Sequence, residues 1–418
     1  MQEPLDTVTL SPKPPRTQQF ARSDQGADAR AYETMAFRDL VSRAMQLNAS
    51  DIHLCSGEPP RFRIRGEIEL FNLPSVSEEV FRRWVTDILA PEQIKRYDQE
   101  QEYDTAVFFP GMIRCRVNLF FSLLGPAMVV RLIPLLAKGI DELGLPTKLK
   151  DISENPKGLV LVTGPTGSGK STTLAAMVRY LNENYKKNII SIEDPIEYVH
   201  QSIKCSIRQR EVGIHTQSFD RALRSVLRED PDIILIGEMR DRLTVEVALK
   251  AAQTGHLVFG TLHTNSAVAT IDRILNIYPP SEQEPMRHQI AESLVAIVSQ
   301  MLVPSNDGGR RAVMEIFINT VTAQDYIDRG VYDELAQLIP TCSYEGMQTM
   351  NQVLHALVKG GIITGEVAEK YSPVPNEMAQ LLRGKLTTTE EAVASSDTER
   401  RRGNWDGYSG SYNTRPKR

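Results

Sequence analysis

The residues best suited to chemistry form one glycine-rich stretch, Gly164-Pro-Thr-Gly-Ser-Gly-Lys-Ser171. It matches the phosphate-binding pattern G-x-x-x-x-G-K-[ST] at every position. The glycines allow backbone N–H groups to turn inward around a phosphate, where a side chain would collide. Lys170 can then reach β- and γ-phosphate oxygens, and the Ser171 hydroxyl can coordinate Mg²⁺. The expected nucleotide-binding residues are Gly164, Pro165, Thr166, Gly167, Ser168, Gly169, Lys170, Ser171 and Thr172.

Acidic side chains follow two apolar runs farther along the chain. Glu238 ends the run that starts at Asp232, and Glu193 and Glu197 follow the run 188–192. An acid at the carboxyl end of a strand can hold the Mg²⁺ shell or accept a proton from an attacking water. Carboxylates at one sheet edge repel each other unless a cation neutralises them. We therefore expect Glu238 to be the general base and Glu193 a metal ligand; an exposed acid at a strand end is the alternative.

Two histidines bracket the apolar run between them. His263 would lie at the carboxyl edge beside the acids, where it could sense the γ-phosphate, whereas His256 would begin the strand. A structural role is the commoner one for a single histidine, and spacing alone does not exclude it. Arg116 and Arg131 fall on predicted strands of a first domain, which could close over a nucleotide as an arginine clamp.

These residues need a sheet to bring them together. The run 158–163 has the composition of a buried parallel strand, and a helical pattern begins near Lys170. Strands then alternate with helices, which predicts an α/β fold with parallel strands and crossovers. We expect strands at 188–192, 232–238, 256–263 and 313–318, and helices at 219–227, 243–253, 283–302, 348–359 and 364–371.

The preceding segment has a different pattern. A helical repeat over 31–48 and strand-like runs at 52–54, 61–66, 104–109, 112–121 and 127–133 surround a second helix at 77–88, which predicts a small α+β domain. The predicted organisation is a disordered leader 1–30, this domain at 31–134, a linker 135–153, a second domain 154–385 and a disordered tail 386–418.

Composition limits the alternatives. The chain has 418 residues, 41% hydrophobic and 24% charged, with a formal charge of −5. No apolar run approaches the ~20 residues of a membrane helix, and the polar start predicts a cytoplasmic protein. The four cysteines are scattered, which argues against a zinc ribbon or a disulfide framework. The acidic balance gives no support to nucleic-acid binding, and a nucleic-acid motor should carry a basic, aromatic-rich strand-binding loop, which we do not find.

Taken together, the motifs resemble the secretion ATPase superfamily that powers type II and type IV secretion and type IV pili. Its four boxes correspond to the glycine-rich stretch, to Ile192-Glu-Asp-Pro-Ile-Glu-Tyr198, to the segment 223–241 that ends beyond Glu238, and to Thr254-Gly-His-Leu-Val-Phe-Gly-Thr-Leu-His-Thr-Asn265. Ala49-Ser-Asp-Ile-His-Leu54 and Arg116-Val-Asn118 resemble landmarks of its N-terminal domain. Within the superfamily the chain is most similar to the PilT-like pilus retraction branch.

The resemblance implies a RecA-like motor domain behind a smaller PAS-like domain, a homohexameric ring, and ATP with Mg²⁺ between the two domains. It implies catalytic roles for Glu238, Glu197, Lys170 and His263, and nucleotide contacts from Arg116, Arg131 and His256. The implied partner is a pilus platform protein of the inner membrane, which the ATPase would meet at the cytoplasmic face without being embedded.

Two features bear on the branch. The cysteine-rich module and long N-terminal extension of the secretion and extension ATPases are absent, which favours retraction. The retraction motif Ala-Ile-Arg would fall at Thr322-Ala-Gln324, without its arginine. A secretion ATPase or an accessory pilus regulator therefore remains the alternative.

Overall fold

The computed structural model describes residues 32, 35–64, 66–71, 73–133 and 137–384. The expected leader 1–30 and tail 386–418 lie outside this part of the chain. The protein divides at Ile133 into two compact units, and we describe each by itself.

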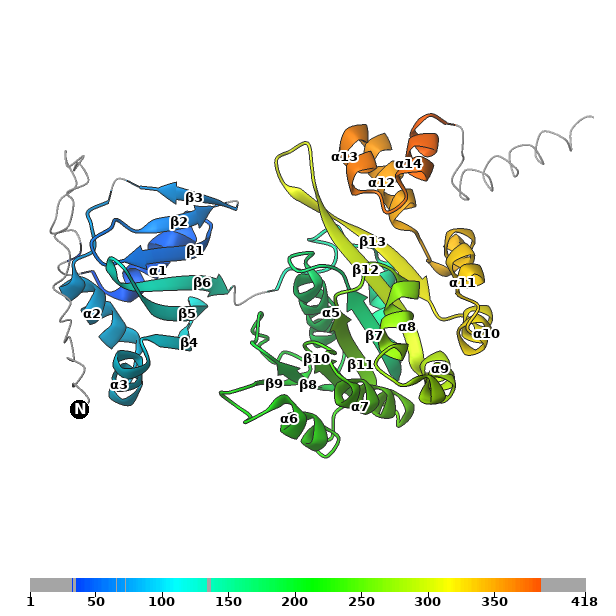
Figure 1. Cartoon of the computed structure of the whole chain (residues 1–418), viewed down its shortest axis with the longest axis horizontal. Helices are drawn as coiled ribbons and strands as arrows, with labels where there is room; N and C mark the ends of the chain where they lie inside the picture. The colour runs from blue at the N-terminus through cyan, green and yellow to red at the C-terminus, as the bar shows by residue number, and fades with distance from the viewer. Residues whose placement is uncertain (1–31, 33–34, 65, 72, 134–136, 385–418) are drawn as a thin grey trace, which may run out of the picture. The chain divides into compact units, whose positions relative to one another are not determined.

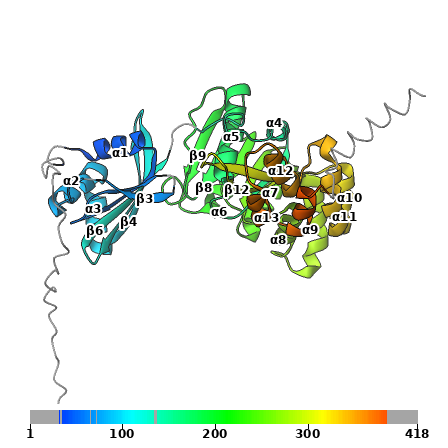
Figure 2. The ribbon, with the colours of Figure 1, turned by 90° about the horizontal axis from the view of Figure 1, so that it is seen from above.

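The N-terminal unit contains a six-stranded antiparallel sheet in the order β3-β2-β1-β6-β5-β4. The strands are β1 (Ala49–Cys55), β2 (Arg61–Ile64), β3 (Glu67–Leu70), β4 (Glu102–Phe109), β5 (Ile113–Ser122) and β6 (Gly125–Ile133). Helices α1 (Phe37–Gln46), α2 (Glu78–Ile88) and α3 (Pro91–Glu100) accompany the sheet (Figures 1 and 2). Alternate strand residues such as Cys115, Val117 and Leu119 are buried with the helices in one core, so polar residues of β5 occupy the other face.

The C-terminal unit contains a seven-stranded sheet in the order β13-β12-β7-β11-β10-β8-β9. The strands are β7 (Gly158–Thr163), β8 (Asn188–Glu193), β9 (Ser206–Glu211), β10 (Ile233–Ile236), β11 (Leu257–Leu262), β12 (Leu294–Pro304) and β13 (Arg310–Ile318). Neighbours are parallel except β13, which pairs antiparallel with β12, so the sheet is mixed. The chain is thus an α/β protein with an antiparallel N-terminal sheet and a mixed C-terminal sheet.

Helices cover both faces of the second sheet because its central strands are apolar on both sides. In β7, Leu159 and Leu161 face one core, while Val160 and Val162 face another. The helices of the two covering layers are α4 (Lys148–Ser153), α5 (Lys170–Asn184), α6 (Phe219–Val226), α7 (Arg242–Gln253), α8 (Ala267–Leu275), α9 (Pro280–Ser293), α10 (Val321–Arg329) and α11 (Tyr332–Leu338).

The long β12–β13 hairpin reaches from the central sheet toward a third group of helices (Figure 1). These are α12 (Met350–Lys359), α13 (Gly365–Tyr371) and α14 (Pro375–Leu382). Val303 of β12 and Val313 of β13 are fully buried in a core with Met350, Leu354 and other residues of these helices. We call this group the C-terminal helical cluster.

One sequence prediction is wrong in a way that affects the site. We expected a helix over 283–302, but α9 ends at Ser293 and β12 begins at Leu294. Apolar residues fill the run 294–303 almost continuously, and such a run cannot be assigned to a buried helix or a buried strand by periodicity. The structure also contains β3, β9, α3, α4, α8, α10, α11 and α14, which we did not predict.

None of the described helices is both long enough and apolar enough to cross a bilayer.

Candidate active site

The phosphate-binding loop joins β7 to α5 and is packed directly on β12. A Cβ at Gly164 would lie 2.1 Å from the carbonyl oxygen of Gln300, so only glycine fits. Gly169, in the left-handed region with φ of 91°, is the N-cap of α5, whose first residue is Lys170. The loop therefore opens onto the N-terminus of a 15-residue helix, where backbone N–H groups and the helix dipole favour an anion.

Lys170 rests on the loop itself. Its side chain is largely buried, and Nζ donates hydrogen bonds to the carbonyl oxygens of Gly164 at 2.8 Å and Pro165 at 3.1 Å. Burial lowers the pKa of Lys170, while the charges of Glu238 and Glu197 act to raise it. Both acids therefore lie within electrostatic reach of the ammonium group, as a shared phosphate site requires.

Three strands end together beside this loop. The N–H of Gly237, after β10, donates to the carbonyl of Ile192 in β8 at 2.8 Å. The Thr261 hydroxyl of β11 donates to the Gly237 carbonyl at 2.5 Å, and Met239 N donates back to the Thr261 carbonyl at 2.9 Å. These bonds hold the carboxyl ends of β8, β10 and β11 in one row. Each strand end leads into a predicted site residue.

Glu238 and His263 meet in this row. Nε2 of His263 lies 3.2 Å from Oε1 of Glu238, and the Arg240 guanidinium lies 2.7 Å from Oε2. The hydrogen bond from Arg240 holds the pKa of Glu238 below its usual value, with smaller contributions from the charges of Arg240, His263 and Lys170. Glu238 is thus an ionised carboxylate with one oxygen on a cation and the other on an imidazole.

Glu193, the last residue of β8, and Glu197, in the loop after it, are placed differently. Glu193 accepts hydrogen bonds at Oε1 from Ser191 Oγ (2.6 Å) and Gln209 Nε2 (3.1 Å), and burial raises its pKa. Those donors make Glu193 a residue that holds the loop. Glu197 is exposed, and the hydroxyl of Tyr198 next to it lies 2.8 Å from the Thr172 hydroxyl of α5. The loop is therefore tied to the phosphate-binding helix immediately after Glu197.

His256 is not part of this group. It precedes β11, and its carbonyl accepts a hydrogen bond from Gly158, the first residue of β7, whereas the phosphate-binding loop follows the last. Its Nδ1 lies 3.0 Å from the Ala251 carbonyl at the end of α7. His256 and His263 thus lie at opposite ends of β11, and a nucleotide contact by His256 remains a prediction.

Arg116 and Arg131 are directly opposite each other on β5 and β6 of the N-terminal unit, so both project from the same face. Both are exposed, and Nε of Arg131 lies 2.9 Å from Oδ1 of the buried Asp51. Their contact with a nucleotide remains a prediction.

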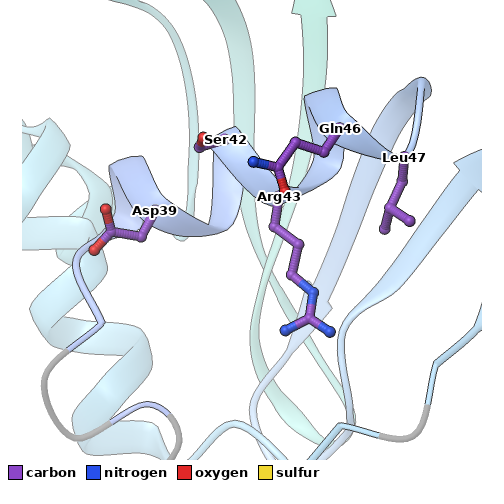
Figure 3. Close-up of a pocket in the computed structure, with 5 residues that line it drawn as sticks. All are labelled: Asp39, Ser42, Arg43, Gln46 and Leu47. Carbon is purple, nitrogen blue, oxygen red and sulfur yellow. The ribbon is translucent and has the colours of Figure 1, made fainter.

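A shallow hollow lies along α1 of the N-terminal unit (Figure 3). Helix α1 contributes most of its lining, and none of the predicted site residues takes part. The lining residues are Asp39, Ser42, Arg43, Gln46 and Leu47. We assign no role to it.

Sequence reasoning missed Gln300, Ser299 and Thr173. Ser299 Oγ lies 2.9 Å from Thr163 Oγ1 at the end of β7, and Gln300 contacts the loop itself. Assigning 294–303 to a strand parallel to β7 would have placed both residues at the carboxyl edge. Because we predicted a helix over this run, we did not expect either residue at that edge.

Comparison with known proteins places these features in context. The Type II/IV secretion system protein family matches residues 26–370. The type IV pilus retraction ATPase PilT of Pseudomonas aeruginosa is 45% identical over 341 residues, which cover 82% of this chain and 99% of that protein. A twitching motility protein of Neisseria gonorrhoeae is 46% identical over 340 residues, covering 80% and 91%. A crystal structure of the pilus retraction motor PilT with bound ADP superposes with a TM-score of 0.76 at 42% identity, covering 82% of this chain and 98% of that one.

Proposed function

Because the chain belongs to the Type II/IV secretion system protein family, we propose that it is a PilT-like ATPase that retracts type IV pili and so drives twitching motility. One observation carries the proposal: the similarity to a retraction ATPase extends over 99% of that protein, and it includes an intact phosphate-binding loop. In this proposal the two units correspond to the PAS-like and RecA-like domains of the family.

ATP is the proposed substrate of the loop 164–171. The N-terminus of α5 supports this, because its N–H groups and its dipole favour the phosphate chain. Lys170 would exchange its two loop carbonyls for β- and γ-phosphate oxygens, and the loop N–H groups would hold the rest of the phosphate chain.

Mg²⁺ fits the oxygen donors present. Ser171 begins α5 next to Lys170, and Glu238 and Glu197 act on the same ammonium group. No three His, Cys, Asp or Glu side chains of the described segments form a metal site, so the ion would share its coordination with the nucleotide phosphates. Ser171 is the proposed ligand, with Glu193 the weaker candidate because Ser191 of β8 and Gln209 of β9 already donate hydrogen bonds to it. Bound Mg²⁺ would neutralise phosphate charge.

Glu238 is the proposed general base. Its ionised carboxylate can accept the proton of an attacking water, and His263 holds one of its oxygens in place. A lowered pKa weakens a base, so Arg240 must move away or share its charge with the phosphate for Glu238 to act. Glu197 is the alternative base.

Assembly and partner follow from the same relationship. We propose a homohexamer that acts on a pilus platform protein of the inner membrane from its cytoplasmic face. In that ring Arg116 and Arg131 would supply charge to the transition state, as arginine fingers do in other phosphoryl transfer enzymes.

A second role in the same machine is an accessory pilus ATPase. It is favoured by α10, where Thr322-Ala-Gln324 stands in place of the retraction motif and none of these three positions is an arginine.

A deletion strain tests the proposal. Complementation with the wild-type gene, but not with a Lys170→Ala gene, should restore twitching to cells that otherwise carry abundant pili that do not retract. Cells without pili would indicate an assembly ATPase. Normal twitching in the deletion strain would support the accessory role.

A further inference from the structure

Gln300 of β12 is a buried amide that contacts the phosphate-binding loop and the helix after it. Its side chain is 2% exposed. Nε2 donates to the carbonyl oxygen of Ser168 at 2.7 Å, and Oε1 accepts from the hydroxyl of Thr173 in the first turn of α5, also at 2.7 Å. One side chain therefore connects the last turn of the loop with the helix that it starts.

The same residue limits the space behind the loop. A Cβ at Gly164 would lie 2.1 Å from the Gln300 carbonyl oxygen, and one at Gly169 would lie 2.8 Å from Nε2. Leu302, two residues along the same face of β12, is 3.8 Å from that second position. Both ends of the loop therefore pack against Gln300, the Gly164 end on its backbone and the Gly169 end on its side chain, so the side chain at position 300 bears on the Gly169 end.

The hydrogen bond to Ser168 has a consequence for the next N–H group. The peptide unit is planar and trans, so the N–H of Gly169 points away from the carbonyl oxygen of Ser168. Since that carbonyl faces Gln300, the Gly169 N–H faces away from β12. It belongs to the row of amides that a loop of this kind presents to phosphate.

We propose that Gln300 is a positioning residue of the ATPase site. It holds the Ser168–Gly169 peptide in the orientation that binds phosphate, and through Thr173 it fixes the first turn of α5 against the loop. The inference rests on the proposed binding of ATP to this loop, and it adds a determinant of nucleotide affinity that lies outside the glycine-rich motif.

The test is Gln300→Leu, which keeps much of the volume and removes both bonds. The Ser168 carbonyl and the Thr173 hydroxyl would stay buried without partners, so the peptide should turn to find others. Titration with a fluorescent ADP analogue should show at least ~10-fold weaker binding, the equivalent of about 1.4 kcal/mol and within the range for a single buried unpaired group.

Gln348→Leu is the matched control. The Gln348 amide donates to the Met314 carbonyl at 2.9 Å, and Met314 is paired with Gln300 across β12 and β13. The control therefore removes an amide–backbone bond from the adjacent strand without touching the loop. It should lower thermal stability, though less than Gln300→Leu because one bond is lost instead of two, while leaving the dissociation constant for ADP within ~2-fold of wild type.

A second pair keeps the inference testable if Gln300→Leu does not fold. Thr173→Val removes the hydroxyl that donates to Gln300, whereas Thr173→Ser retains it. We expect weaker ADP binding with valine and near-normal binding with serine. Wild-type affinity in folded Gln300→Leu, or equal affinities in valine and serine variants, would overturn the proposal. A wild-type protein that binds no nucleotide would refute the proposed function itself.

Discussion

Replacing Glu238 by Gln removes the proposed proton acceptor while keeping the shape of the side chain. In the wild-type protein Nε2 of His263 lies 3.2 Å from Oε1 of Glu238. The amide is nearly isosteric with the carboxylate and keeps an oxygen at this position. It loses the charge that faces Arg240 at 2.7 Å. That guanidinium is 67% exposed, so losing the ion pair should cost less than about 1 kcal/mol of the free energy of unfolding. The variant should therefore fold normally.

Turnover should respond far more strongly than stability. Loss of a general base typically slows a reaction by about 10²- to 10⁴-fold, so we expect kcat of Glu238→Gln to fall at least ~100-fold. Affinity for ATP should change little, since Lys170 and the loop amides remain. The pKa of Lys170 should decrease, because one of the two acids that favour its charged form is lost.

Steady-state ATP hydrolysis, together with equilibrium binding of a non-hydrolysable ATP analogue, measures both effects on one sample. Glu246→Gln is the control, because Glu246 forms a comparable exposed ion pair with Arg242 at 2.7 Å on α7. Normal turnover in Glu238→Gln would refute the assignment and transfer the role to Glu197. Simultaneous loss of binding would indicate that Glu238 is first a metal ligand.

Three further predictions concern the cations around the site. Lys170→Ala should abolish ATP hydrolysis, and wild-type turnover in this variant would contradict the assignment of the loop. Arg131→Ala should reduce hydrolysis by ~10³-fold or more, because an arginine finger is lost, while the hexamer persists, because Arg131 pairs with Asp51 of its own sheet. Sedimentation and turnover on one sample decide it, and a variant that is monomeric would make Arg131 an interface residue. In the nucleotide-free site the pKa of Glu238 is lowered mainly by Arg240, so kcat/KM should fall only as pH drops below the usual glutamate range. Arg240→Ala should move that acid limb of the pH–rate profile to higher pH, and an unmoved limb would show that another group controls it.

The parts of the site that lie next to each other in sequence were predictable. A strand, a glycine-rich turn and a helix are contiguous between Gly158 and Asn184, so local pattern determines them. Glu238 and His263 could be placed at the same sheet edge because each follows an apolar run, and parallel strands share their carboxyl edge.

Contacts between distant strands were not predictable from pattern. The order that brings β12 beside β7 is set by packing, and an apolar run such as 294–303 is compatible with a helix or a strand. Gln300 was therefore placed on a helix, away from the loop it contacts. The ion pair of Glu238 with Arg240 depends on rotamers after the strand end, which no periodicity encodes.

Strand β12 packs against the phosphate-binding loop on one face and against the C-terminal helical cluster on the other. Gln300 and Leu302 face the phosphate-binding loop, whereas Met301 and Val303 pack against the C-terminal helical cluster on the other side. The phosphate-binding loop and the helices that begin at Met350 thus pack on opposite faces of one strand, and truncation of Val303 would leave a cavity directly behind the residues that support the loop.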